Sequence, residues 1–362
     1  MVERWILTLL LAVCLVVSAS LAQPSAEVGC GKVLASKDPL GLIFNGFEST
    51  PGMWPWHVAL MHLEAFCATA DETSCPIMPL YKCGGTIINR DTVLTAYHCV
   101  AGIEGPIEVE RLVVRGGLFD LLHEPDQENH VLEVLFPPEA SVKTFDGDIA
   151  VLKMQTEFEY GVNIQPACIR TTKQPIDDLV EMQGTVIGWG LTERGFISRT
   201  LIEANVPVVS PNECLQGDSR FHLALTSKIY CAGSRNGTSS CNGDSGGGMF
   251  FYMGGHWFLH GLTSFSPGDP KKPGVCDSHN YVAYTNVAKY ITWLQEKGVT
   301  FEDPLISGMP TGEMAVGFAG SGNTRLIRLT LNAKLKKLLQ QQKGEFLLRM
   351  TLNGKKVNSE FE

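Results

Sequence analysis

The amino-acid sequence predicts an all-β fold. From Trp56 onward, short apolar runs of strand length alternate with turn residues, a pattern typical of a sandwich or barrel of short strands. The clearest runs cover residues 57–60, 85–88, 112–115, 149–152 and 184–188. The chain has 362 residues, of which 44% are hydrophobic and 19% charged. This is the composition of an ordinary globular protein, with room for one large domain and further segments.

The N-terminus has the composition of an export signal. Arg4 precedes an apolar run over residues 5–17, and Ser20 and Ala22 supply the small residues of a cleavage site. We therefore predict a signal peptide over residues 1–22. The alternative is a membrane anchor, which the short apolar run disfavours. Residues 23–42 are short and polar, and we predict that they form a propeptide.

The cysteine count agrees with secretion. The chain has eleven cysteines, and Cys14 would leave with the signal peptide, so an even number remains. In an exported protein this indicates full pairing, although the sequence alone does not give the connectivity. The competing interpretation, zinc binding, is disfavoured because no paired Cys-x-x-Cys spacing is present.

Ser245 lies in the most informative segment, residues 241–248, where a run of glycines follows Asp244 and Ser245. Glycines allow the tight, positive-φ turn that brings backbone N–H groups close to whatever the serine attacks. A serine hydroxyl needs a base within hydrogen-bond reach to act as a nucleophile. Upstream, His98 lies in Thr-Ala-Tyr-His-Cys, and Asp148 lies directly before an apolar run in Asp-Gly-Asp-Ile-Ala-Val-Leu.

The order His98, Asp148, Ser245 resembles that of the trypsin/chymotrypsin family of serine endopeptidases and differs from the orders in subtilisins and α/β-hydrolases. The resemblance covers residues 43–297 and includes Trp-Pro-Trp at 54–56, Cys-Gly-Gly at 83–85, Gly-Trp-Gly at 188–190 and the helix-like segment 287–294. It implies two antiparallel six-stranded barrels with the active site between them and a C-terminal helix. The insertion at 67–75 and the loop around Cys276 are similar to those of secreted arthropod proteases of digestive or haemolymph type.

The resemblance implies a role for each of these residues. Ser245 would be the nucleophile, His98 its general base and acid, and Asp148 the group that orients His98, whereas Asp146 does not directly precede the strand. Backbone N–H groups of Gly243 and Ser245 would form the oxyanion hole, and a side chain at Gly243 would crowd the substrate. The chemistry needs no metal or cofactor.

Five disulfides also follow from the resemblance. It implies the pairs Cys83–Cys99, Cys214–Cys231, Cys241–Cys276 and Cys30–Cys168, and leaves Cys67–Cys75 as a local pair. The Cys30–Cys168 bond would tether the N-terminal segment to the catalytic domain.

Family members are activated when a newly freed N-terminus pairs with the aspartate before the nucleophile. Here that pair would be Ile43 and Asp244. The residue before Ile43 is Leu42 rather than Arg or Lys, so a trypsin-like activator would find no target there. Cleavage after Lys37 would instead expose a polar N-terminus. We expect either an activating protease that prefers large apolar residues or no conventional activation.

The resemblance places the substrate pocket at Ser239, Ser264, Ser266 and Val282. No acid stands at Ser239, the pocket floor, so selection of Arg or Lys is not expected. Ser266 and Val282 would narrow the pocket and favour small or medium apolar side chains. The sequence departs from the family at Tyr97, which we expect to crowd the cleft, and at Gly248, where proline is usual.

The segment 298–362 falls outside the resemblance, as a C-terminal extension of unknown role. Its prolines and glycines indicate a linker, followed by weak alternation at 325–331 and helical spacing with a basic face at 334–340. A solvated, partly disordered tail is favoured over a helix that binds an anionic surface. Asn236 begins the glycosylation sequon Asn-Gly-Thr, close to the pocket.

The function that fits these observations is that of a secreted, extracellular serine endopeptidase made as a precursor. Its partners would be protein or peptide substrates, an activating protease and inhibitor proteins. The net charge of −9 disfavours nucleic acid as a partner, and a membrane role is disfavoured. The alternative is a catalytically silent, protease-like regulatory or binding protein in an extracellular cascade.

Overall fold

The computed structural model describes residues 29–35, 47–67, 75–172, 175–191, 195–224, 227–237, 240–272, 274–307, 313–318, 325–330, 348–352 and 355–359. Beyond residue 305 it describes the backbone alone. The chain divides into two compact units, Met1–Pro304 and Leu305–Glu362. Within the described residues, no helix combines the length and apolar character needed to cross a membrane.

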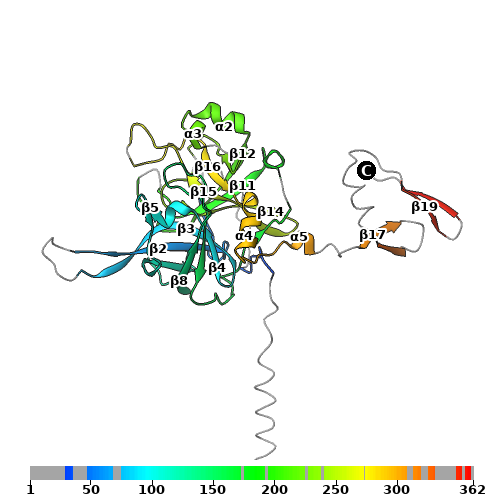
Figure 1. Ribbon diagram of the computed structural model, residues 1–362, viewed down its shortest axis with the longest axis horizontal. Coiled ribbons are helices and arrows are strands. Elements are labelled where there is room, and N and C mark those ends of the chain that lie inside the picture. The colour runs from blue at the N-terminus through cyan, green and yellow to red at the C-terminus, as the bar shows by residue number, and fades with distance from the viewer. Residues whose placement is uncertain are drawn as a thin grey trace, which may run out of the picture. The chain divides into compact units, whose positions relative to one another are not determined.

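The first barrel is a closed sheet of six antiparallel strands in the order β2-β3-β4-β9-β8-β7 (Figure 1). These strands are β2 (His57–Ala65), β3 (Ile77–Asn89), β4 (Thr92–Thr95), β7 (Leu112–Gly116), β8 (Gln127–Leu135) and β9 (Ala150–Met154). The outer ends of β2 and β3 continue past the barrel as a hairpin, which projects from it in Figure 1.

The second barrel closes in the order β12-β11-β14-β15-β16-β13, with β13 paired back to β12. Its strands are β11 (Gln183–Gly188), β12 (Ile202–Val209), β13 (Ile229–Ala232), β14 (Gly248–Met253), β15 (His256–Phe265) and β16 (Val282–Asn286). Two short strands, β1 (Phe47–Glu48) and β10 (Cys168–Ile169), add to its edges. Helix α4 (Ile291–Glu296) follows. The predicted pair of six-stranded antiparallel barrels with a C-terminal helix is confirmed.

One hydrophobic core runs from the first barrel into the contact between the two barrels. Trp56, Trp189 and Phe250 are completely buried in it, and Trp54 stacks on Phe250 with ring centroids 5.8 Å apart. Aromatic burial of this size fixes how the barrels pack against each other. The loops that carry His98 and Ser245, one from each barrel, are therefore held on a rigid frame.

The N-terminal segment at residues 29–35 docks on the second barrel. Cys30 is disulfide-bonded to Cys168, and the backbone of Gly31 bonds to Pro166 O at 2.7 Å and Trp257 N at 3.0 Å. The Cys30 N–H donates to Glu302, which lies after α4. The first unit thus continues to Pro304, past the predicted boundary after residue 297, because the segment beyond α4 is bound to the barrel.

Five disulfides connect the described residues, and they join the cysteines that the resemblance pairs. They are Cys30–Cys168, Cys67–Cys75, Cys83–Cys99, Cys214–Cys231 and Cys241–Cys276.

The second unit contains two antiparallel hairpins. Strands β17 (Glu313–Phe318) and β18 (Arg325–Thr330) form one, and β19 (Leu348–Leu352) and β20 (Lys355–Ser359) form the other. The segment 325–331, where the sequence alternates weakly, contains strand β18. Its partner β17 lies in the segment whose prolines and glycines indicated a linker. Helix α5 (Pro304–Ser307) lies in that segment too. Strand pairing satisfies the hydrogen bonds of backbone N–H and C=O groups whatever the side chains are. The amino-acid composition of this segment was therefore not enough to predict its strands. The helical spacing at 334–340 lies outside the described residues.

Candidate active site

His98 is held by a short helix at the end of the first barrel. This 3₁₀ helix, η1 (Tyr97–Cys99), follows β4 directly and is bonded to β3 through Cys83–Cys99. The Val100 N–H closes the turn on Tyr97 O at 2.9 Å. The imidazole is consequently presented from a cross-linked turn rather than from a free loop.

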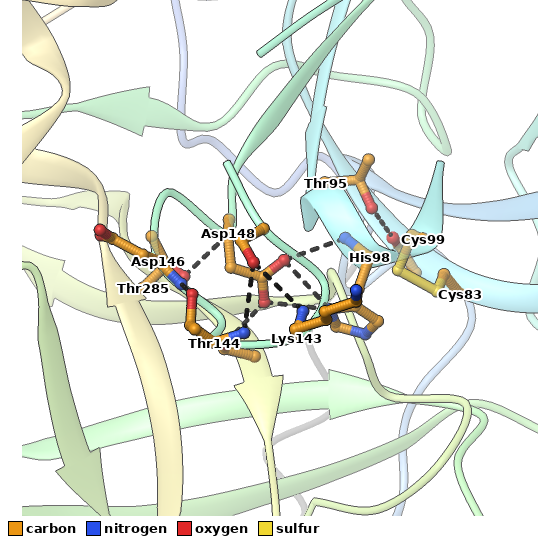
Figure 2. Close-up of polar contacts among 12 residues, drawn as sticks. Cys83, Thr95, His98, Cys99, Lys143, Thr144, Asp146, Asp148 and Thr285 are labelled. Carbon is orange, nitrogen blue, oxygen red and sulfur yellow. Dashed lines mark hydrogen bonds and ion pairs between the residues drawn. A yellow bond between two sulfur atoms is a disulfide. The ribbon is translucent and has the colours of Figure 1, made fainter. Parts of the chain in front are cut away.

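Asp148 is the carboxylate that contacts His98, as Figure 2 shows. His98 Nδ1 lies 2.9 Å from Oδ2 and 3.1 Å from Oδ1, and the His98 backbone N–H donates to Oδ1 at 3.0 Å. Ser264 Oγ donates to Oδ2 at 2.5 Å, and Thr285 Oγ1 donates to the Asp148 backbone oxygen at 2.8 Å. Because a carboxylate only accepts, the Nδ1 proton is fixed on the side of Asp148.

The electrostatics distinguish His98 from the other buried histidines. Burial by itself lowers the pKa of His98, but the charge of Asp148 and its hydrogen bond outweigh that effect and hold the pKa above its usual value. Burial lowers the pKa of His57 to about 3 and that of His260 to about 4. His98 is therefore the histidine suited to accept and return a proton near neutral pH.

Ser245 lies in the loop before β14, against the first barrel. The Gly84 N–H on β3 donates to Ser245 O at 2.8 Å, which joins the two barrels at the serine. Gly246 has φ +73°, and a Cβ there would collide with Thr95 and Gly84, so only glycine fits. Ser245 and His98 line one pocket of about 250 Å³ between the barrels.

Gly243 is held in place by contacts with both barrels. It has φ +98°, and Tyr81 Oη donates a hydrogen bond to its carbonyl oxygen. The sequence suggested that a side chain at Gly243 would crowd the substrate, but the structure gives another reason. A Cβ would lie 2.9 Å from Ile197 Cδ1 and 3.1 Å from Gly190 Cα, within the protein.

The Asp244 carboxylate is turned away from Ser245 and is bound by backbone groups. It accepts hydrogen bonds from Gly190 N and Cys241 N, each at 2.8 Å. Burial raises its pKa to about 6, against the opposing effect of these two N–H groups. It lines a second pocket, of about 350 Å³, whose apolar wall includes Ile187, Leu191 and Ile202. Ile43 lies outside the described residues.

Two phenylalanines form much of the wall of the pocket that contains Ser245. Phe145 meets His98 edge to face at 5.8 Å and stacks on Phe265 at 5.2 Å. Phe145 has φ +57°, an uncommon value for a bulky residue. Phe145 was not predicted from the sequence, because its place at the pocket depends on its contacts with His98 and Phe265. No acidic side chain occurs among the described residues of this wall.

Only some of the residues predicted to form the substrate pocket line it in the structure. Ser264 and Ser266 line the pocket, and the Ser264 hydroxyl also contacts Asp148. Val282 does not line it: the residue is 1% exposed and packs in the core of the second barrel with Tyr230 and Tyr284. The prediction that Val282 narrows the pocket is therefore wrong, because its side chain occupies the core side of β16. Ser239 lies outside the described residues.

The two departures from the family pattern are accommodated by packing. Tyr97 was expected to crowd the cleft, but it is buried, with its ring 4.8 Å from that of Phe136. At Gly248 a Cβ would collide with the ring of Phe250, so the core leaves no room for a larger residue. Asn236 is exposed on a loop, and Thr238 of its sequon lies outside the described residues.

Two groups of possible metal ligands occur among the described residues, and both contain a disulfide. They are Cys30, Cys168 and His256, and Cys83, His98 and Cys99. Thiolate is the form of cysteine that binds metals, and a disulfide does not supply it. Neither group fits a zinc site.

Comparisons with known proteins agree with this geometry. A family model described as Trypsin matches residues 43–294. The chain is 31% identical over 237 residues to the CLIP domain-containing serine protease B4 of Anopheles gambiae. The aligned region covers 60% of this chain and 62% of that protein. It is 29% identical to the serine proteinase stubble of Drosophila melanogaster, over 75% of this chain and 33% of that protein. It is 28% identical to Limulus clotting factor C of Carcinoscorpius rotundicauda, over 74% of this chain and 26% of that protein. The alignments thus span less than two thirds of each relative.

Proposed function

Because the chain belongs to the trypsin family, we propose that it is a secreted serine endopeptidase that acts through Ser245, His98 and Asp148. The observation that carries the proposal is the hydrogen-bonded pair of His98 and Asp148 at the pocket that Ser245 lines. The raised pKa of His98 supports the same role.

In the proposed reaction, Ser245 Oγ attacks the carbonyl carbon of the cleaved bond while His98 Nε2 takes the hydroxyl proton. Asp148 keeps the other ring proton on Nδ1 and stabilises the imidazolium that forms. His98 then gives its proton to the leaving amine, the C–N bond breaks, and an ester on Ser245 remains. A water molecule then attacks that ester while His98 takes its proton. The ester C–O bond breaks, His98 returns the proton to Ser245 Oγ, and the acid product is released.

The attacked carbonyl oxygen becomes negatively charged in each tetrahedral intermediate. We assign its stabilisation to the backbone N–H groups of Gly243 and Ser245. The loop that carries them is fixed by the bond from Tyr81 Oη to Gly243 O and the bond from Gly84 N to Ser245 O. Because both anchors lie on β3, the first barrel supports donors that belong to the second.

Activation would follow cleavage between Leu42 and Ile43, after removal of a signal peptide over residues 1–22. The new ammonium group would pair with Asp244, and the Ile43 side chain would enter the adjoining apolar pocket. The raised pKa of Asp244 supports this because a buried carboxylate without a cation is costly. The Trypsin match begins at residue 43, the same position.

Selectivity for small or medium apolar side chains, rather than Arg or Lys, is supported by the composition of the pocket. Phe145 and Phe265 provide an apolar wall, and Ser264 and Ser266 add no charge. Protein substrates, an activating protease and inhibitor proteins in an extracellular cascade fit the similarity to proteins named as a CLIP domain protease and a clotting factor. A glycan on the exposed Asn236 would limit the size of substrates that approach.

Hydrolysis of short peptide amides tests this proposal. Four p-nitroanilides that differ only in the residue before the cleaved bond (Val, Leu, Phe or Arg) would be offered to the form beginning at Ile43. We expect hydrolysis of the Val and Leu substrates, less of the Phe one and little of the Arg one, and none by a Ser245→Ala variant. Preferential cleavage of the arginyl substrate would contradict the selectivity, and equal rates in both proteins would contradict the role of Ser245.

A further inference from the structure

Residues 195–201, which we call the linking segment, lie against the loop that carries the proposed oxyanion donors. Ile197 forms an isolated bridge with Leu191, and the Leu191 N–H donates to Asn242 O at 2.8 Å. Ile197 also packs on Gly243 so closely that an added Cβ would lie 2.9 Å from Ile197 Cδ1. The position of the backbone at Gly243 thus depends on where Ile197 lies.

Burial alone does not fix Ile197, because the residue is 42% exposed. Hydrogen bonds hold the backbone directly after it. The Ser198 N–H is shared between Trp189 O at 3.1 Å and Gly190 O at 3.2 Å, and Ser198 Oγ donates to Thr200 O at 2.6 Å. The linking segment is therefore fixed from its C-terminal side.

The linking segment is also joined to the first barrel, at residues 119–122 between β7 and β8. The Leu121 N–H donates to Arg199 O at 3.0 Å, and the Leu201 N–H donates to Phe119 O at 2.8 Å. The two stretches form an antiparallel bridge here. The segment that positions Ile197 in the second barrel is thus held by backbone bonds from the first.

An ion pair closes this junction. Arg199 Nε donates to Asp120 Oδ2 at 2.7 Å, and the Leu122 N–H donates to Oδ1 at 2.9 Å. His123 also faces this carboxylate, with Nδ1 3.6 Å from Oδ2, but its ring is 74% exposed. The Asp120 side chain is 7% exposed and that of Arg199 is 60% exposed. Because a buried carboxylate without a cation is costly, Asp120 holds Arg199 in place.

The ion pair lies outside the substrate pocket. Neither Asp120 nor Arg199 is among the described residues that line the pocket of Ser245. The contacts instead form a path: Asp120 binds Arg199, the chain leads two residues back to Ile197, and Ile197 packs on Gly243. This path affects the reaction through the position of a backbone group rather than by touching the substrate.

We propose that Arg199 is a positioning residue for the oxyanion donor at Gly243. The proposal rests on the proposed function and deepens it. Paired with Asp120, Arg199 holds the linking segment so that Ile197 keeps the Gly243 N–H directed at the oxygen that becomes negative. That donor matters most when the charge has developed, so the effect belongs to the transition state rather than to substrate binding.

Steady-state kinetics on the best p-nitroanilide, with the form beginning at Ile43, test this split. Arg199→Gln should lower kcat about fivefold and leave KM nearly unchanged, and Arg199→Lys, which keeps the charge, should recover most of the loss. Arg115→Gln is the matched control, because Arg115 Nε lies 2.6 Å from Glu128 Oε2 within the first barrel. This control should leave both constants unchanged.

A pair of inhibitors separates a positioning role from a general structural one. A peptide aldehyde adds to Ser245 Oγ, and its carbonyl oxygen then takes the place of the oxyanion, whereas the matching peptide alcohol forms no such bond. In Arg199→Gln the inhibition constant of the aldehyde should rise about fivefold and that of the alcohol should stay constant. A structural defect would weaken both inhibitors alike.

Double variants test the path. Adding Asp120→Asn or Ile197→Ala to Arg199→Gln should lower kcat no further than the more severe single variant, because each change interrupts the same path. Fully additive losses would overturn the proposal. So would an unchanged kcat in Arg199→Gln, a higher KM at constant kcat, or an equal rise in the inhibition constants of the aldehyde and the alcohol.

If no substrate is hydrolysed by the unaltered chain, the proposed function has failed, and hydrogen exchange tests the positioning separately. Exchange of the backbone amides over residues 242–247 would be followed by mass spectrometry, with reduction of Cys241–Cys276 before digestion. These amides should exchange faster in Arg199→Gln than in the unaltered chain and in Arg115→Gln. Equal exchange in all three proteins would show that Arg199 does not position this loop.

Discussion

The hydroxyl of Tyr81 donates a hydrogen bond to the carbonyl oxygen of Gly243, with 2.5 Å between the two oxygens. The Tyr81 ring meets Trp189 edge to face at 5.6 Å. Burial and the nearby Asp244 charge hold the Tyr81 pKa well above its usual value, so the hydroxyl keeps its proton and remains a donor. A side chain of the first barrel thus holds the backbone of Gly243, the residue of the second barrel whose N–H we propose as an oxyanion donor.

Replacing Tyr81 by Phe should lower kcat without raising KM. The variant keeps the ring contact and loses one buried hydrogen bond, which is worth a factor of about 3 to 10. Steady-state kinetics on the best p-nitroanilide measure this split. Tyr252→Phe, at an exposed position of β14, is the control. A higher KM at constant kcat would assign Tyr81 to substrate binding instead.

The pH dependence should report the His98 pair with Asp148. Protonated His98 cannot accept the Ser245 proton, so kcat/KM should rise as pH increases through the pKa of His98, which lies above 6.5. The Asp148→Asn variant loses the negative charge that raises the pKa of His98, so the midpoint of the pH–rate profile should move to lower pH. The kcat should fall by about 10⁴-fold because the ring proton is no longer held on Nδ1. An unchanged midpoint in a pH–rate profile would show that another group titrates.

Activation should change how stability depends on pH. Burial raises the Asp244 pKa from 3.8 to about 6 in the folded precursor, so the folded state binds the proton more tightly than the unfolded chain. The precursor should therefore lose stability as pH rises from about 4 to 6. In the form beginning at Ile43, the ammonium group would stabilise the charged carboxylate and remove this loss.

Thermal unfolding of both forms between pH 4 and 7 measures this effect. The Tm of the processed form minus that of the precursor should increase with pH, and the increase should vanish with Asp244→Asn in both forms. If Asp244 is present and the difference in Tm between the two forms does not change with pH, then no ammonium group pairs with the Asp244 carboxylate.

The N-terminal segment should stay attached after cleavage at Leu42. Cys30 and Cys168 are bonded across 138 residues of sequence, so residues 23–42 would remain linked to the catalytic domain. Intact mass under denaturing conditions should show release of this peptide only after reduction. The double variant Cys30→Ser, Cys168→Ser should release it without reduction, whereas Cys67→Ser, Cys75→Ser should not. Release from the unaltered chain without reduction would contradict the tether.

The features that could be predicted from the sequence are those encoded by a short, contiguous stretch of residues. The segments around His98, Asp148 and Ser245 each have their own motif, and strand-length apolar runs indicated the β fold. The contacts that complete the site have no such local signal. Ser264 reaches Asp148 across 116 residues, and Tyr81 reaches Gly243 across 162. They depend on how the two barrels pack.

Other residues were predicted at the right place along the chain but with the wrong side-chain orientation or the wrong secondary structure. Val282 was expected in the substrate pocket, but which face of β16 it occupies depends on the twist and closure of the second barrel. Tyr97 was expected to crowd the cleft, but its ring packs against the ring of Phe136. Strand β17 was missed because Gly317 and the glycines that flank the strand indicated a linker, whereas pairing with β18 makes it a strand.

The most direct test of the central claim is active-site labelling with a fluorophosphonate, which reacts only with an activated serine. The precursor, the form beginning at Ile43 and its Ser245→Ala variant would each be treated, digested and mapped by mass spectrometry. We predict modification of Ser245 in the processed form and none in the variant. Absence of labelling in both forms, with folding verified by circular dichroism, would contradict a functioning triad and favour a non-catalytic binding protein.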